Sequence, residues 1–206
     1  MIQTVQAKNI TLRDLIDQFD LELVQDDDFF REWQDNLPAI TELEKQMLDR
    51  VKAGYFNLMN NPPLLEKTIQ IAIAAPILHL AGFFLPPFHI KTEQSIEIEI
   101  EDEGILIKGS LDVLILKEQL WLLIIESKRA AFSIEAGLGQ ILAYMLGSPH
   151  PNQPSFGMIT TGGSFIFLKL VKGERPQYAA SRIFELRNPG NDLYNVLSIL
   201  KRISQL

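Results

Sequence analysis

Two carboxylates and a lysine lie where apolar stretches of this sequence run out. Asp112 lies within the apolar run 110–116, and Glu126 and Lys128 end the apolar run 120–128. Carboxylate oxygens are ligands that Mg²⁺ prefers, and a bound Mg²⁺ lowers the pKa of its water molecules. A lysine beside such a pair can orient or deprotonate an attacking water, or neutralise charge on a phosphate. The three residues therefore predict a Mg²⁺ or Mn²⁺ site that hydrolyses phosphodiester bonds.

A β-hairpin is the element that would bring these three residues together. The polar residues 117–119 separate the two apolar runs, as is typical of a hairpin turn. Alternation along a strand predicts that Ser110, Asp112 and Leu114 share one face. A turn centred on the second polar residue makes Glu126 a diagonal neighbour of Asp112, and one centred on the third sets the two directly opposite. A slip by one residue in the pairing would separate them.

Four short motifs carry a resemblance to a known family. They are Gly109-Ser110-Leu111-Asp112, Glu126-x-Lys128, Gln140-x-x-x-Tyr144 and Thr160-Thr161-Gly162-Gly163-Ser164-Phe165. In this order they resemble the PD-(D/E)XK nuclease superfamily, and in finer detail the N-terminal nuclease domain of type I restriction enzyme R subunits. The resemblance covers roughly residues 64–170. Leu111 departs from the proline of the superfamily pattern, and no helicase motor follows, so a role as a whole restriction enzyme is not expected for this chain alone.

The resemblance implies a set of metal ligands and a DNA substrate. Asp112 and Glu126 would bind Mg²⁺ or Mn²⁺, joined by the backbone carbonyl of Ser127. A glutamate from the helix before the sheet would also reach the metal; Glu66 is the first choice and Glu93 its rival.

The resemblance assigns the remaining motif residues as well. Lys128 would assist the attacking water, Gln140 would lie near the metal or the scissile strand, and Tyr144 would brace Gln140 one helical turn on. The structural alternative is an ion cluster at a sheet end without catalysis. In that case the chain would be a catalytically inactive nuclease-fold module that binds nucleic acid or protein.

The elements around the motifs predict an α/β (α+β) fold with a restriction-endonuclease-like core. Its order is helix, three antiparallel strands, helix and strand, with added N- and C-terminal helices. We expect one domain of three parts: a helical extension over 1–61, the nuclease-like core over 62–171 and a C-terminal extension over 172–206. The expected core elements are helix 64–80, strands 90–101, 110–116 and 120–128, helix 134–146, and strands 156–161 and 165–171.

Outside the core, capping residues and apolar spacing predict three helices. Thr11 caps a short helix, and Thr41 with Glu44 forms a capping box for helix 40–53, which Gly54 ends or bends. The last helix, 193–203, is amphipathic and expected outside the core. The aspartates 26–28 are expected to complement a helix dipole rather than bind metal, and the aromatic residues 29, 30 and 33 to dock on the main domain or on a partner.

Composition limits the partners and the compartment. The 206 residues contain no cysteine and carry a net charge of −7, which argues against strong non-specific DNA binding but not against a metal nuclease. No signal peptide or membrane span is predicted, so a cytoplasmic location is expected. Cutting both strands with one such site requires a second copy, which is compatible with a homodimer. The basic residues that could rim the cleft are Lys128, Arg129, Lys169, Lys172, Arg175, Arg182 and Arg187.

Overall fold

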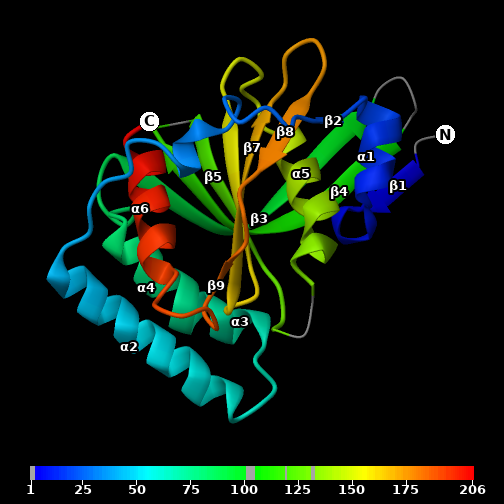
Figure 1. The fold of residues 1–206 in the computed structure, drawn as a ribbon. Helices are drawn as coiled ribbons and strands as arrows, with labels where there is room; N and C mark the ends of the chain where they lie inside the picture. Colours follow the sequence, from blue (N-terminus) through cyan, green and yellow to red (C-terminus); the bar gives the residue numbers. More distant parts are fainter. Residues whose placement is uncertain (1–2, 101–104, 119, 131–132) are drawn as a thin grey trace.

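A mixed β-sheet forms the centre of the computed structural model, which describes residues 3–100, 105–118, 120–130 and 133–206 (Figure 1). The strands are β1 (Gln3–Gln6), β2 (Glu22–Leu23), β3 (Phe88–Ile100), β4 (Ile105–Lys117), β5 (Leu120–Ser127), β6 (Ser155–Thr160), β7 (Ser164–Val171), β8 (Gln177–Ala180) and β9 (Phe184–Glu185). As predicted, β3, β4 and β5 form an antiparallel meander. β6 pairs in parallel with β5 and antiparallel with β7. Residues 101–104, which include the end of the predicted strand 90–101, lie outside the described part.

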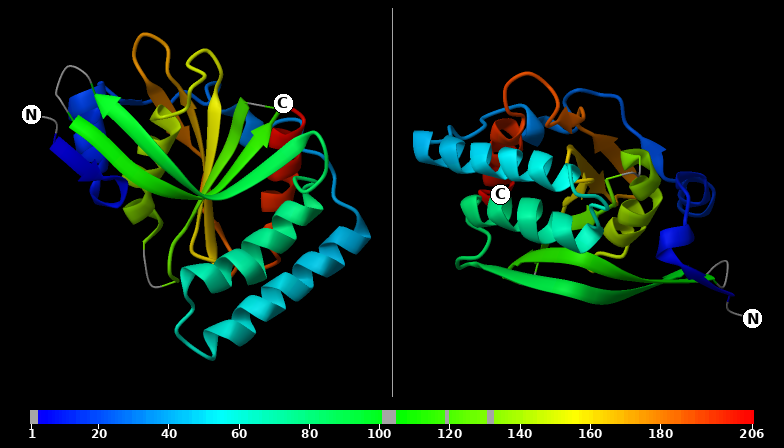
Figure 2. Two further views of the ribbon diagram at one scale, coloured as in Figure 1. Left: turned by 180° about the vertical axis from the view of Figure 1, so that it is seen from behind. Right: turned by 90° about the horizontal axis from the view of Figure 1, so that it is seen from below.

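Helices cover both faces of this sheet, so the fold is mixed α/β. They are α1 (Leu12–Phe19), α2 (Glu42–Met59), α3 (Glu66–Ile69), a π-helical segment (Gln70–Ala74), α4 (Ala75–Leu80), α5 (Leu138–Leu146) and α6 (Leu193–Ser204), with 3-10 turns at Ala7–Asn9, Arg31–Trp33 and Ile134–Gly137. One core cluster packs α3, α4 and α6 on the sheet, and a second packs α1 and α5 on the other face. Figure 2 shows α2, in cyan, outside α3 and α4.

The register of the β4–β5 hairpin is set by a β-bulge. Next to the turn, Lys117 pairs with Leu120, and that register alone would separate the two predicted carboxylates. Leu122 is an extra residue in β5, so the pairing shifts and Val113 lies opposite Ile125. Continued by one residue, this register sets the two carboxylates directly opposite, which is the second of the two predicted registers.

Alternation along β4 breaks at Asp112, contrary to the prediction that Ser110, Asp112 and Leu114 share a face. Ile107 and Leu111 lie in the same core cluster as Leu114, although an unbroken strand would put odd and even residues on opposite faces. Across from this point on β3, Glu93 has a φ of 53°, between the pairs that flank it. The left-handed residue of β3 therefore lies across from the point at which the alternation of β4 changes phase.

The strands β1 and β5 share one edge of β4 and leave a gap between them. β1 pairs with residues 105–108, β5 pairs with residues 113–117, and β3 occupies the opposite edge. In the described pairings, residues 109–112 of β4 therefore lack a strand partner on this edge. A backbone group left without a strand partner must find a side chain or water instead. The gap is thus the place in the sheet where side chains replace strand pairing.

The N-terminal part contributes strands that the helical prediction for 1–61 missed. β1 pairs with β4 and β2 pairs with β8, so this part extends both ends of the sheet order. These strands have four and two residues, which is too short for an alternation of apolar and polar residues to be recognised in the sequence. The predicted helix at Thr11 is confirmed as α1, with its capping box.

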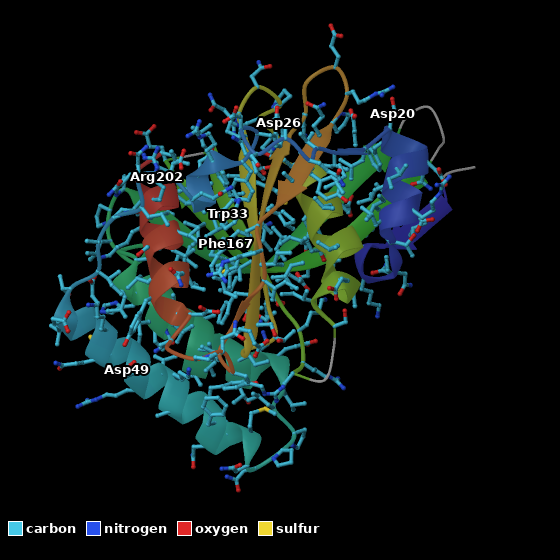
Figure 3. All side chains as sticks on the ribbon, in the orientation of Figure 1. Asp20, Asp26, Trp33, Asp49, Phe167 and Arg202 are labelled. Atoms are coloured by element: carbon cyan, nitrogen blue, oxygen red, sulfur yellow. The ribbon has the colours of Figure 1, made fainter. Side chains whose placement is uncertain are left out.

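The aromatic residues near the N-terminus dock on the main domain. Phe30 contacts the Phe156 ring, and Trp33 meets Phe184 edge-on at a centroid distance of 6.3 Å. The Phe184 ring contacts both Trp33 and Phe167, which are labelled in Figure 3. Phe29 and Phe30 lie in a turn over residues 27–30, and Trp33 ends the following 3-10 turn, so the predicted helix opened by aspartates 26–28 does not form.

Three of the predicted helices differ from expectation. The helix that starts at the Thr41 capping box runs past Gly54 to Met59, because a single interior glycine costs only about 1 kcal/mol relative to alanine. The predicted helix 64–80 contains a π-helical segment before Pro76, and Ile71 is 74% exposed in a helix expected to be buried. The prediction that the last helix lies outside the core is wrong: α6 buries six apolar side chains in the larger core cluster.

Candidate active site

The gap between β1 and β5 brings together the residues of the first three motifs. The backbone N–H of Ser127, at the end of β5, donates to Oδ2 of Asp112 at 2.7 Å. The hydroxyl of Tyr144, from α5, donates to the carbonyl of Ser110 at 3.0 Å. Each bond satisfies a backbone group of the gap with a side chain. Asp112 is thus fixed against the backbone that carries Glu126 and Lys128.

A chain of hydrogen bonds links the lysine to α5. Nζ of Lys128 donates to Oε1 of Glu126 at 2.8 Å and to Oε1 of Gln140 at 2.5 Å. Nε2 of Gln140 donates in turn to the Tyr144 hydroxyl at 3.0 Å. Gln140 and Tyr144 are four residues apart, so they lie one above the other on the same face of α5. The Lys128 ammonium is therefore held between a carboxylate and an amide oxygen.

The fourth motif holds the backbone of Lys128. Its N–H donates to the carbonyl of Thr160, at the end of β6, at 2.8 Å. The hydroxyl of the same threonine accepts the N–H of Gly162 at 3.0 Å, in the turn between β6 and β7. The position of Lys128 is therefore set by both its main chain and its side chain.

Burial of Glu126 governs the electrostatics of the site. The residue is 3% exposed, and the pKa of its carboxyl rises from 4.5 to about 7, chiefly because of this burial. The negative charges of Asp112 and Glu66 contribute to the rise, whereas the charge of Lys128 and its hydrogen bond oppose it. The carboxylates in and near the site therefore carry more negative charge than the Lys128 ammonium neutralises.

Tyr144 requires a glycine across from it. A Cβ built on Gly109 would lie 2.6 Å from the Tyr144 hydroxyl oxygen and 2.7 Å from Cβ of Ala7. No side chain fits at such distances, so the first residue of the Gly-x-x-Asp motif makes room for the tyrosine. Burial raises the pKa of Tyr144 to about 12, so the hydroxyl keeps its proton and remains a donor.

Glu66 and Glu93 lie differently with respect to the site. Glu66 is the first residue of α3, and its charge acts on the carboxyl of Glu126. Glu93 is largely exposed and forms an ion pair with Lys67, which lowers the pKa of Glu93. The negative charges of Asp112 and Glu66 also raise the pKa of the Lys67 ammonium. Lys67 is a site residue that the sequence reasoning missed, although it directly follows Glu66.

The donor set fits a divalent cation that keeps water or phosphate ligands. Oε2 of Glu126 is buried and has no hydrogen-bond partner, and a buried carboxylate oxygen without a partner is costly. Asp112 supplies a second carboxylate, whose Oδ2 is engaged by Ser127. Among the residues that the structure describes, no three His, Asp or Glu side chains are grouped closely enough to hold a metal alone. Two carboxylates with water and phosphate are a common set for Mg²⁺, whereas a full protein cage is not.

Most of the predicted rim of basic residues is engaged elsewhere. Lys169 pairs with Glu32, Lys172 donates to the carbonyl of Ser148, Arg175 pairs with Asp20, and Arg182 lies 4.0 Å from Asp192. Of the seven, Lys128 lies in the site and Arg129 follows it directly. Of the seven predicted basic residues, Lys128 and Arg129 are therefore the ones placed to supply positive charge at the site.

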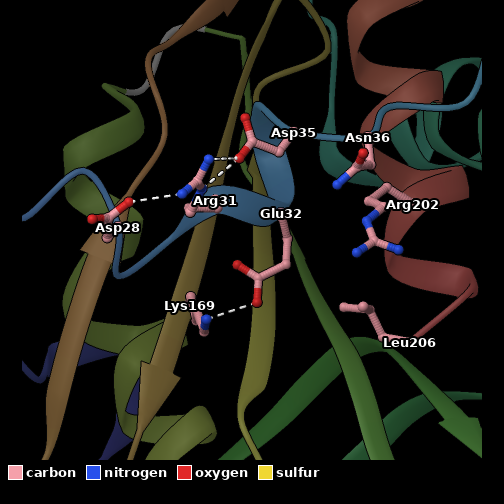
Figure 4. A pocket seen from close by; sticks show the side chains of 8 residues that line it. All are labelled: Asp28, Arg31, Glu32, Asp35, Asn36, Lys169, Arg202 and Leu206. Carbon is pink, nitrogen blue, oxygen red and sulfur yellow. Dashed lines mark hydrogen bonds and ion pairs between the residues drawn. The ribbon is translucent and has the colours of Figure 1, made fainter.

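A charged cavity elsewhere in the molecule is lined by none of the candidate active-site residues. It has a volume of about 410 Å³ and lies between the 3-10 turn at Arg31–Trp33 and α6 (Figure 4). Its lining residues are Asp28, Arg31, Glu32, Asp35, Asn36, Lys169, Arg202 and Leu206. Arg31 pairs with Asp28 and Asp35, so part of its charge is already neutralised within the cavity.

Comparison with known proteins leaves the four motifs as the basis for any family assignment. No protein-family model matches the chain, and no curated protein is a significant match to it. In the described part of the chain, no helix has the length and apolar content needed to cross a bilayer.

Proposed function

We propose that this protein is a divalent-metal-dependent nuclease that hydrolyses phosphodiester bonds of DNA. The observation that carries the proposal is the buried cluster of Glu126, Lys128 and Gln140, with Asp112 hydrogen-bonded beside it. A surface ion pair needs neither an unpartnered buried carboxylate oxygen nor an amide oxygen on its ammonium. A site that binds a cation and positions a water uses both.

The order of the elements supports a restriction-endonuclease-like core for this nuclease. The helical stretch α3–α4 precedes the meander β3–β4–β5, and α5 and the parallel strand β6 follow. This is the order that the resemblance implies. The four motifs fall within one region of that core: the gap in β4, the end of β5, one face of α5 and the end of β6.

Each residue of the proposed active site has a distinct role. Asp112 and Glu126 would hold Mg²⁺ or Mn²⁺, with the backbone carbonyl of Ser127 as a further ligand. Glu66 is not grouped with these two carboxylates closely enough to complete a three-carboxylate site, so it contributes through its charge on Glu126. The bound ion supplies Lewis acidity and a water of lowered pKa. Lys128 orients the attacking water and balances negative charge on the phosphate. Gln140 positions the ammonium of Lys128 through the 2.5 Å hydrogen bond.

The decisive experiment is the substitution Lys128→Ala. We expect metal-dependent cleavage of DNA to fall at least about 100-fold, because general acid–base and electrostatic assistance contribute effects of this size. Cleavage is measured with Mg²⁺ or Mn²⁺ on single-stranded, duplex and RNA substrates, and folding by circular dichroism. Lys45→Ala is the matched control, because Lys45 pairs with Glu42 on the exposed surface of α2. Wild-type protein that leaves all these substrates intact would refute the proposal.

A binding module without catalysis is the second candidate. The observations that favour it are the net charge of −7 and the engagement of most basic residues away from the site. Titration calorimetry with Mn²⁺ separates the two. The nuclease binds the ion and loses it on Asp112→Asn, whereas the module shows no heat of binding in either protein.

A further inference from the structure

An apolar groove adjoins the candidate active site. It has a volume of about 400 Å³ and is lined by Met59, Pro62, Pro63, Leu64, Leu65, Arg129 and Ala130. Apart from Arg129, these side chains are hydrophobic or proline, and Leu65 is 44% exposed. An exposed apolar groove of this size suits the apolar face of a ligand.

Two residues that line the groove are direct chain neighbours of site residues. Leu65 precedes Glu66, whose charge acts on Glu126, and Arg129 follows Lys128. Adjacent Cα atoms are 3.8 Å apart, so the backbone that lines the groove meets the backbone of the site at these two points. A nucleotide next to a phosphate at Glu126 is therefore within reach of the groove.

The chemistry of the groove fits the flat face of a base and not its edge. Bases pack their faces against aromatic or apolar side chains, and such stacking does not depend on sequence. In a duplex the faces are hidden by the neighbouring base pairs. Of the lining residues, Arg129 alone has a polar side chain, and it is exposed beside the site, where a guanidinium can bind a phosphate.

We propose that this groove holds an unpaired nucleotide next to the scissile phosphate, so that the substrate is single-stranded or frayed DNA. The inference rests on the proposed nuclease function and narrows its substrate. The charge of the chain agrees with it. A protein of net charge −7 gains little from the phosphates of a duplex, so base packing must supply part of the affinity.

The test compares strands and two matched variants. Binding is measured by fluorescence anisotropy with a labelled 20-nucleotide single strand and with the same strand in a duplex, and cleavage of both is measured with Mn²⁺. Leu65→Gln keeps the size of the side chain and removes its apolar character. Ile71→Gln is the control, because Ile71 is exposed on the same helical stretch but lines a different groove. Arg129→Gln removes the cation.

We expect the wild type to bind and cleave the single strand at least about 10-fold better than the duplex. Leu65→Gln should weaken single-strand binding about 5-fold or more, in the range of losing one stacked base, and Arg129→Gln should weaken it as well. Ile71→Gln should change neither. If the wild type cleaves both substrates equally and Leu65→Gln binds like the wild type, the groove inference is wrong while the nuclease function stands. If no substrate is cleaved, the nuclease function fails, and unchanged binding by Leu65→Gln then rejects the groove separately.

Discussion

The carboxyl of Glu126 sets the pH dependence at the scale of single residues. Its pKa rises from 4.5 to about 7, chiefly by burial, so the folded protein binds this proton more tightly than the unfolded chain does. The protein's stability should therefore be highest, with respect to this group, below about pH 4.5, and should fall as the pH rises to about 7. At about 1.4 kcal/mol per pH unit, the full loss is about 3 kcal/mol.

Glu126→Gln tests this dependence. The substitution keeps the shape and removes the charge, so we expect the free energy of unfolding of the metal-free protein to become nearly flat between pH 4.5 and 7. The measurement is urea denaturation in EDTA at several pH values within that window. A wild type whose stability does not decline there relative to Glu126→Gln would show that the carboxyl is solvated in solution.

Because Tyr144 is hydrogen-bonded to Gln140, we expect it to act through Gln140 and not on the reacting atoms. Tyr144→Phe removes the donor to the part-buried Ser110 carbonyl and the acceptor of the buried Gln140 amide, so both groups lose this partner. We expect a loss of about 1–3 kcal/mol in stability. We also expect a smaller loss of cleavage rate than Lys128→Ala causes, because Lys128 keeps its carboxylate partner. Denaturation and single-turnover cleavage are the measurements, and a rate as low as that of Lys128→Ala would assign the hydroxyl a direct catalytic role.

At the scale of elements, the gap in β4 depends on Gly109. Gly109→Ala places a Cβ 2.6 Å from the Tyr144 hydroxyl and 2.7 Å from Cβ of Ala7, so the 3-10 turn at Ala7–Asn9 or α5 must shift. Overpacking of this kind costs about 1–3 kcal/mol, and the displaced tyrosine should lower cleavage as well. Denaturation of the purified variant checks the first effect.

Gly54→Ala is the matched control for this substitution. Gly54 lies inside α2 with no atom within 4 Å of a built Cβ. Alanine there should stabilise the protein by about 0.5–1 kcal/mol, because glycine loses more backbone freedom on folding. If the two variants changed stability equally, crowding at Gly109 would be refuted.

The meander was predictable from the sequence, and its geometry at the site was not. Apolar runs and polar turns define β4, β5, β6 and β7, and capping residues define the starts of α1 and α2. The bulge at Leu122 and the phase change at Asp112 have no local signal, because both arise from how two strands fit together. The sequence therefore predicted which residues lie close together. The prediction that Asp112 shares one face of β4 with both Ser110 and Leu114 was wrong.

At the scale of the whole molecule, α6 belongs to the core. Leu200 is fully buried in the cluster that also contains residues of α3, α4 and β6. Leu200→Ala should lower the free energy of unfolding by about 2–5 kcal/mol, as in other core truncations. Thermal or chemical denaturation measures this, with exposed Ile71→Ala as the control. A cost below about 1 kcal/mol would mean that α6 lies outside the core after all, as its amphipathic sequence suggested.

The prediction for α6 was wrong because an amphipathic pattern shows how much of a helix surface is buried, and not where in the protein the helix lies. One apolar stripe is enough when a helix closes a cluster between the sheet and α2. Asp49 of α2 accepts hydrogen bonds from Asn191 and Tyr194 at the start of α6, and Lys201 binds Glu44 nearby. These contacts join residues more than 140 positions apart in the chain, so no local sequence pattern predicts them.

The placement of β1 and β2 has a consequence for synthesis on the ribosome. Both strands precede their partners along the chain: β1 must wait for residues 105–108, and β2 for residues 177–178. Until those residues emerge, the early segment has no ladder to join and exposes unpaired edges to other nascent chains. The β1 margin of the sheet can close once residues 105–108 are made, whereas the β2 margin closes only after residues 177–178.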